Sequence, residues 1–364
     1  MDRLKERENM KLAQLRDVIM IAFAYMGIIV GAGLASGQEV LQYYTSFGVM
    51  GTIGALVATV LYMYTGWALV WIGSRLKTIS HKNAIYRMSG RALGAIIDYI
   101  MIFTLFGVGV VMLAGAGSNL EQQFGLPNVA GVMIMTLLII FVGMMKLDKV
   151  VTVIGSITPF LLVFVVIISL YSFLTADAAF AELDNFAKAE LASTLPNWLI
   201  AGINHASFNT AVGASMALVM GGANQNPKVA GLGGLLGGLG IGLMILISHL
   251  AIFTKIEDVA DSDLPMLTIV NEISPVLGVI MSIVLFGMIF STAISMFYSF
   301  AARFVERGTK KFNIFLIVTM IVAFALSFVG FTDLVAWFYP LIGYLGLVLI
   351  IVLIITPFRI KKIE

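Results

Sequence analysis

The sequence has 364 residues, of which 60% are hydrophobic and 12% are charged, and its mean hydropathy is +1.01. Because a soluble domain carries about 25% charged residues, this composition excludes an ordinary soluble protein and predicts a chain that crosses a membrane many times. The net charge of +2 is small and scattered over the chain, which argues against nucleic-acid binding. The absence of cysteine excludes thiol chemistry, and the presence of only three histidines argues against a histidine-built metal centre.

Apolar stretches of about 20 residues, separated by charged or Gly/Pro/Asn breaks, predict ten membrane spans. Every Lys and Arg except Lys188 and Lys255 falls on the cytoplasmic side if the N-terminus lies there, as the positive-inside rule requires. Residues 256–274 are too long for a turn, and a short helix after Pro265 is expected in this outer loop. The predicted spans are roughly 17–45, 48–74, 92–118, 127–145, 149–174, 196–221, 227–254, 275–304, 312–330 and 333–357.

Ten spans divide into two repeats of five with opposite orientation, a common plan of secondary transporters. The chain would then consist of a cytoplasmic tail (1–16), a first repeat (17–174), an extracellular loop (175–195), a second repeat (196–357) and a second cytoplasmic tail (358–364). Substrate sites on this plan lie at mid-membrane, where the equivalent helix of each repeat is interrupted. The plan therefore predicts breaks in spans one and six.

Span one contains glycines and polar residues where an uninterrupted helix would be apolar, in the segment GIIVGAGLASGQEVLQ (27–42). Unwound backbone is tolerated in a membrane only where protein or a polar cavity surrounds it. Freed carbonyls can bind a cation, and freed N–H groups at a helix start can bind a carboxylate. The segment therefore predicts a site for a zwitterion together with a small cation.

Span six contains the matching polar segment GINHASFNTAVGAS (202–215), and Ala35-Ser36 aligns with Ala206-Ser207. By contrast, GLGGLLGGLGIG (231–242) is interpreted as a packing surface, because small residues spaced by four let a neighbouring helix approach. The residues predicted to bind substrate are Gly31, Ala32, Gly33, Ala35, Ser36, Gly37 and Gln38 from span one, Phe106 from span three, and Gly202, Asn204, His205, Ser207, Phe208 and Asn209 from span six.

Ionisable residues inside spans are candidate functional groups, because inserting one costs at least about 2.5–3.5 kcal/mol. Glu39 follows the break in span one and is predicted to line an outer gate or a proton path. Asp98, near the inner end of span three, is predicted to pair with a cytoplasmic Arg or Lys and is a candidate for an inner gate. His205 has two open interpretations, a substrate ligand or a structural residue, whereas His249 is interpreted as structural.

The segment GIIVGAGLASGQE (27–39) resembles the signature of the YkvI-like bacterial membrane proteins, which are similar to the amino acid–polyamine–cation superfamily. That resemblance implies an all-α polytopic protein of the LeuT-type fold, with ten transmembrane helices in a 5+5 inverted repeat whose helices 1 and 6 are broken. In sodium-coupled members one sodium lies between helices one and eight. Carried over to matching positions, its ligands would be Gly27, Val30, Met288, Ser291 and Thr292.

Two departures from that family pattern bear on coupling. Leu34 stands where a second sodium site would need an asparagine, so that second site is expected to be absent. Proton-coupled relatives can place a lysine on span five instead of the sodium. The lysine in this span, Lys149, lies at its cytoplasmic end, which favours sodium.

The sequence thus predicts a sodium-coupled importer of a small amino acid or related zwitterion, working by alternating access in a bacterial cytoplasmic membrane. Both termini would be cytoplasmic, and sodium would be the coupling ion with no other cofactor. Two alternatives stay open: an amino-acid-sensing receptor subunit similar to the germinant receptors, and a proton-coupled or uncoupled transporter. The sequence has no HExxH motif, no GxSxG motif and no paired carboxylates in a span, which argues against an intramembrane enzyme.

Overall fold

The computed structural model describes residues 2–78, 81–144, 158–176, 178–306 and 308–360, and within these ranges every regular element is a helix. The longer helices are α1 (Asp2–Ile29), α4 (Val49–Leu76), α5 (His81–Phe124), α6 (Asn128–Gly143), α8 (Thr158–Leu174), α10 (Trp198–Ala223), α11 (Pro227–Phe253), α14 (Pro275–Phe304), α15 (Lys310–Ser327) and α17 (Tyr339–Ile360). The shorter elements are α2 (Ala32–Ser36), α3 (Gln38–Tyr43), η1 (Thr45–Phe47), α9 (Phe180–Glu190), α12 (Ile256–Val259), α13 (Pro265–Ile273), α16 (Phe331–Asp333) and η2 (Leu334–Phe338).

Long apolar helices make this an all-helical, multi-pass membrane protein. Among the described residues, six helical segments are long and apolar enough to span a bilayer. The helices α6 and α8 are apolar but shorter, and α10 is long but carries His and Asn side chains near its centre. The six segments are Val49–Leu76, Lys82–Phe124, Pro227–Phe253, Pro275–Phe304, Lys310–Ser327 and Phe331–Arg359.

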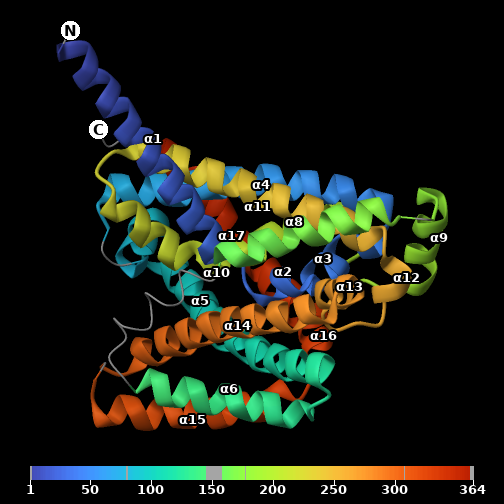
Figure 1. Ribbon diagram of the computed structural model, residues 1–364. Helices are drawn as coiled ribbons and strands as arrows, with labels where there is room; N and C mark the ends of the chain where they lie inside the picture. Colours follow the sequence, from blue (N-terminus) through green and yellow to red (C-terminus); the bar gives the residue numbers. More distant parts are fainter. Residues whose placement is uncertain (1, 79–80, 145–157, 177, 307, 361–364) are drawn as a thin grey trace.

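The helices form two groups (Figure 1). In the first, α1, α4, α10 and α11 pack together. In the second, α5, α6, α14 and α15 pack together. Helix α17 packs on α10, α4 and α5, and the short helices α2 and α3 lie between the groups (Figure 1). Both chain ends lie at one end of the bundle, while α9 and α12 lie at the other (Figure 1).

The connections at the end of the bundle opposite the chain termini include short helices that are fixed by local contacts (Figure 1). Helix α13 begins at Pro265, which confirms the helix predicted there. Asp184 in α9 accepts a hydrogen bond of 2.9 Å from the backbone N–H of Val49 at the start of α4, and it pairs with Lys188. These two donors lower the pKa of the Asp184 carboxyl below its ordinary value of 3.8. The carboxylate therefore anchors α9 to the start of α4 at neutral pH.

Glycines bring the backbones of α4 and α11 into direct contact. A Cβ atom on Gly66 would lie 2.3 Å from the carbonyl oxygen of Gly234, and one on Gly234 would lie 2.1 Å from that of Gly66. A Cβ on Gly238 would lie 2.2 Å from the Tyr62 carbonyl oxygen. These distances leave no room for a side chain, so the packing interpretation of residues 231–242 is confirmed.

We expect Gly238→Ala to lower the melting temperature of the purified protein, because the new methyl group would push α4 and α11 apart. Overpacking of this kind costs about 1–3 kcal/mol. The matched control is Gly240→Ala on the same helix, whose methyl group would meet only the flexible side chain of Met26. Since alanine is the better helix former, the control should be neutral or stabilising. Thermal denaturation followed by circular dichroism measures both, and equal melting temperatures would contradict the close approach.

Candidate functional site

The first apolar stretch is interrupted twice. Helix α1 ends at Ile29, and α2 is a single helical turn that begins after Gly31. Gly37 separates α2 from α3 with φ +87°, in the left-handed region that favours glycine. A Cβ on Gly37 would in addition meet the side chains of Ile252 and Met266 at 2.8 and 2.9 Å. The chain therefore leaves helical geometry on both sides of α2, within the segment where the sequence predicts an interruption.

The interruption leaves backbone groups open. The carbonyl groups of Gly27 and Val30 accept no backbone hydrogen bond from any described residue. On the other side of the gap, the N–H groups of Gly33 and Leu34 donate no backbone hydrogen bond to another described residue, because they lie in the first turn of α2. A segment with free carbonyl oxygens is thus followed directly in the sequence by a segment with free N–H groups.

The predicted break in span six is wrong, because α10 is one continuous helix from Trp198 to Ala223. Its polar side chains find partners on neighbouring segments, so no backbone has to unwind to satisfy them. Asn204 donates to the Pro340 carbonyl oxygen at 3.0 Å, and Ser207 donates to that of Gly343 at 2.6 Å.

Gly202 is a packing residue and not a helix break. A Cβ on it would lie 2.4 Å from the carbonyl oxygen of Gly54 in α4, so the glycine lets the two helices approach closely. Thr210 in the same helix donates to the Ala206 carbonyl oxygen at 2.6 Å, a bond made within a continuous helix. The glycine and the polar side chains of this segment therefore make contacts within α10 and with neighbouring segments.

Glu39 and His205 form a buried pair between α3 and α10. Glu39 Oε2 lies 2.9 Å from His205 Nε2, and the two residues are 3% and 0% exposed. The other carboxylate oxygen, Oε1, lies against Gly33: a Cβ there would be 2.1 Å from it. The structure thus brings together a residue predicted for a gate and one predicted for the substrate site.

Tyrosine hydroxyl groups surround the His205 ring. The Tyr44 and Tyr62 hydroxyls lie 2.7 and 3.1 Å from Nδ1, and Tyr62 donates to the His205 carbonyl oxygen at 3.2 Å. The Asn209 side chain donates to the Tyr62 hydroxyl at 2.9 Å. Asn209 therefore belongs to this network, as a partner of the residues that hold His205.

The tyrosines were missed in the sequence analysis. The Tyr43 ring contacts the His205 ring in a tilted arrangement with centroids 4.6 Å apart, and its hydroxyl donates to Asn204 Oδ1 at 3.3 Å. Tyr43 and Tyr44 follow Glu39 by four and five residues in an apolar span. An i, i+4 spacing places Glu39 and Tyr43 on one helix face, which is the signal that could have identified them.

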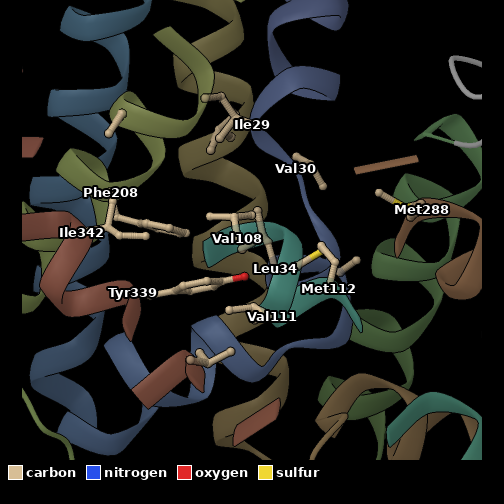
Figure 2. Packing of buried hydrophobic residues seen from close by; sticks show 14 of the residues in the cluster. Ile29, Val30, Leu34, Val108, Val111, Met112, Phe208, Met288, Tyr339 and Ile342 are labelled. Atoms are coloured by element: carbon tan, nitrogen blue, oxygen red, sulfur yellow. The ribbon is translucent and has the colours of Figure 1, made fainter. Parts of the chain in front are cut away.

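An apolar wall lies beside α2. Phe208 and Tyr339 stack with ring centroids 4.1 Å apart, and Figure 2 shows Leu34 and Val108 near the two rings. These residues come from α10, α17, α2 and α5. Ala35 and Ser36 are fully buried in α2.

Phe106 does not belong to this apolar wall. Its ring contacts those of Phe297 and Phe300 in α14, with centroids 6.3 and 5.2 Å apart. The sequence therefore predicted the wrong residue of α5 for this wall: Val108, and not Phe106, lies near Phe208 (Figure 2).

A chain of hydrogen bonds closes the site towards α12 and α13. Gln38 Nε2 donates to the Thr332 hydroxyl at 3.1 Å, and Thr332 donates to Asp263 at 2.5 Å. Ser118 of α5 donates to the other oxygen of Asp263 at 2.6 Å. Beyond this chain lies a cavity of about 300 Å³, lined by Ser118, Glu121, Gln122, Asp261, Ser262, Asp263 and Thr268. Gln38 is therefore part of the closing contact.

The predicted sodium ligands lie on α1, directly after it at Val30, and on α14. Val30 and Met288 are buried in one apolar cluster (Figure 2), whereas Gly27 is exposed. Helix α14 contacts this region through α2. The predicted ligands are thus not all gathered at one point.

The hydroxyl groups of Ser291 and Thr292 are half-buried and donate no hydrogen bond to another described residue. Hydroxyls elsewhere in the long helices are of both kinds: Thr59 and Thr356 donate to the carbonyl four residues earlier, whereas the buried hydroxyls of Thr136 and Ser248 have no partner among the described residues. Lys149, which was weighed for proton coupling, lies outside the described residues.

Two further polar residues have defined partners. Asp98 of α5 forms an ion pair with Arg303 of α14, which confirms the predicted pairing with a basic residue. His249 lies 3.1 Å from the hydroxyls of both Thr45 and Thr52, so it links α11 to η1 and α4. This arrangement agrees with a structural role for His249.

Two curated proteins of Bacillus subtilis (strain 168) are similar to the chain over nearly its whole length. The uncharacterized membrane protein YkvI is 28% identical over 330 residues, covering 91% of this chain and 93% of that protein. The uncharacterized protein YyaD is 23% identical over 333 residues, covering 91% and 94%. No protein-family profile matches the chain. The predicted resemblance to the YkvI-like membrane proteins is confirmed by this similarity.

Solved structures share the fold. The complex of MhsT with L-phenylalanine superposes with a TM-score of 0.62 at 17% identity, covering 85% of this chain and 78% of that chain. A mutant of the Eremococcus coleocola manganese transporter gives 0.51 at 14%, with 83% and 69% covered. The same transporter in complex with an aromatic bis-isothiourea compound gives 0.53 at 13%, with 87% and 70% covered. The fold is LeuT-like.

Proposed function

We propose that this protein is a secondary transporter, and not an enzyme, that imports a small amino acid or related zwitterion together with sodium by alternating access. The observation that carries the proposal is the twice-interrupted first stretch in a LeuT-like fold, whose open backbone groups precede Glu39, the residue that contacts His205 at the polar centre of α10. Interrupted helices between two helix groups form the substrate sites of such folds. Ten spans and cytoplasmic termini belong to this proposal.

The substrate would lie between α2 and α10. The open N–H groups of Gly33 and Leu34 suit a carboxylate. The apolar wall of Phe208 and Tyr339 suits an uncharged side chain. The bonds from Gln38 to Thr332 and onward to Asp263 would open to admit substrate from the side of α12 and α13.

Sodium would bind between α1 and α14. The unpaired carbonyls of Gly27 and Val30 and the hydroxyls of Ser291 and Thr292 are neutral oxygen ligands, which suit a hard monovalent cation. Because Gly27 is exposed and α14 reaches this stretch through α2, we expect α1 to move towards α14 when sodium binds. Coupling then follows, since the same interrupted stretch would hold both ligands.

Uptake into proteoliposomes tests this proposal. The purified protein is reconstituted and supplied with each of the twenty standard amino acids in radiolabelled form, with an inward gradient of sodium or of choline. We expect uptake of at least one amino acid to require sodium, and Ser291→Ala/Thr292→Ala to reduce that uptake at least about tenfold, as loss of one or two ligand bonds of about 1.4 kcal/mol implies.

The matched control for the hydroxyl ligands is Ser295→Ala. Ser295 is exposed on the same helix and donates to the Ser291 carbonyl oxygen at 2.8 Å, so its loss should leave uptake unchanged. Uptake that is equal in sodium and choline would contradict the coupling. The absence of uptake for all twenty amino acids would contradict the substrate class.

A further inference from the structure

We infer that the Glu39–His205 pair is a proton-binding site, which takes up one proton when the first apolar stretch packs on α10 and releases it when the two separate. The role of this proton in a transport cycle rests on the proposed function. The binding site itself rests on the burial, the contacts and the charges of the two side chains.

Because the pair is buried, its net charge determines how stable the closed arrangement is. Glu39 and His205 are 3% and 0% exposed, and 2.9 Å separates Oε2 from Nε2. An ionised carboxylate in such a place costs several kcal/mol unless an opposite charge compensates it. A protonated His205 is the only cation that a contact among the described residues offers to Glu39. The closed arrangement is therefore neutral only when the pair holds one proton.

The surrounding groups do not supply a fixed positive charge. The titratable side chains that face the pair are tyrosines: Tyr43 and Tyr44 at the end of α3, Tyr62 of α4 and Tyr339 of α17. His249 of α11 lies beyond Tyr44, with ring centroids 6.5 Å apart. Within the described part of the chain, no Lys, Arg or second carboxylate pairs with either residue.

The proton can occupy either of two positions in the closed arrangement. It lies either on the Glu39 carboxyl, with His205 a neutral imidazole, or on His205, with Glu39 ionised. In the second case Nε2–H donates to Glu39, and Nδ1–H donates to the Tyr44 hydroxyl oxygen at 2.7 Å. When the pair separates into water, the proton passes to a water molecule and leaves a carboxylate and a neutral imidazole. The pair thus binds and releases the proton as one unit.

The backbone provides the means of separation. His205 lies in the middle of the continuous helix α10, whereas Glu39 follows the left-handed Gly37 by two residues. A change of backbone angles at Gly37 would move Glu39 relative to a fixed His205 and would carry Tyr43 and Tyr44 with it. Movement of the interrupted stretch and release of the proton are therefore the same event.

Infrared difference spectroscopy of the purified full-length protein tests proton binding without any substrate. Among the carboxyl and imidazole bands that change across pH, one carboxyl band and one imidazole band should change together, as a coupled titration. We expect Glu39→Gln and His205→Gln each to abolish it. The matched controls are Glu121→Gln, an exposed carboxylate of α5, and His249→Gln, whose ring contacts two threonine hydroxyls. Both should retain the titration, and its persistence in Glu39→Gln and His205→Gln would overturn the inference.

Uptake measurements connect the site to transport. In proteoliposomes supplied with the twenty amino acids, uptake by the wild type should fall by up to about tenfold for each pH unit above the midpoint of the titration, since one proton is linked to closure. Glu39→Gln, which keeps a neutral hydrogen-bonding group, should make the uptake independent of pH. A Glu39→Gln profile that matches the wild type would overturn the link. If the wild type takes up no amino acid but titrates as expected, the transport proposal fails and the proton site stands.

Discussion

Replacing Gly33 with alanine should reduce amino-acid uptake at least about tenfold, because the added methyl group occupies the space of the Glu39 carboxylate. A Cβ on Gly33 would lie 2.1 Å from Glu39 Oε1 and 2.7 Å from Cδ. Glu39 would have to move away from His205, and breaking a buried charged pair costs about 3–5 kcal/mol. Initial uptake rates in proteoliposomes and the melting temperature in detergent measure the effect.

A second substitution separates this steric cause from a general loss of structure. Glu39→Asp shortens the side chain by one methylene group and frees the space that the methyl group needs. The double variant Gly33→Ala/Glu39→Asp should therefore recover part of the uptake, and the two changes should not be additive, because the side chains are in contact. Wild-type uptake by Gly33→Ala alone would contradict the position of the carboxylate.

The parts of the fold that could be predicted depend on local patterns. The glycine spacing in 231–242 predicts that another helix packs closely against this segment, without indicating which one. The neighbour is α4, whose Gly66 contacts Gly234. The double break around α2 is also local, since Gly31 and Gly37 lie within the quoted segment. Asp98 had to pair with a basic residue, because an unpaired charge in a span is costly.

The site could not be predicted in full, because its contacts join distant parts of the chain. Asn204 and Ser207 donate to Pro340 and Gly343, each 136 residues away. A polar segment has the same composition whether neighbouring segments accept hydrogen bonds from its side chains or its backbone is unwound. The sequence therefore could not show that α10 is continuous. Glu39 and His205 are 166 residues apart, and neither sequence segment indicates the other.

We expect Asp98→Ala to lower the free energy of unfolding by about 1–3 kcal/mol. The side chain of Asp98 is 8% exposed and that of Arg303 is 28% exposed, so the cost lies below the value for a fully buried pair. Arg303→Ala should destabilise the protein similarly. The double variant should lose less than the sum of the two, because the first change already removes the interaction. Melting temperatures of the three variants measure the coupling.

The position of this pair also indicates how it would act in transport. Asp98 lies in α5 and Arg303 in α14, and these helices pack along each other within the second group. A contact inside one group does not have to break when the groups move relative to each other. We therefore expect uptake per folded molecule to be retained in Asp98→Ala while its stability falls. If instead Asp98 closes an inner gate, the same variant will keep its melting temperature and lose tight coupling, seen as sodium entry without amino acid.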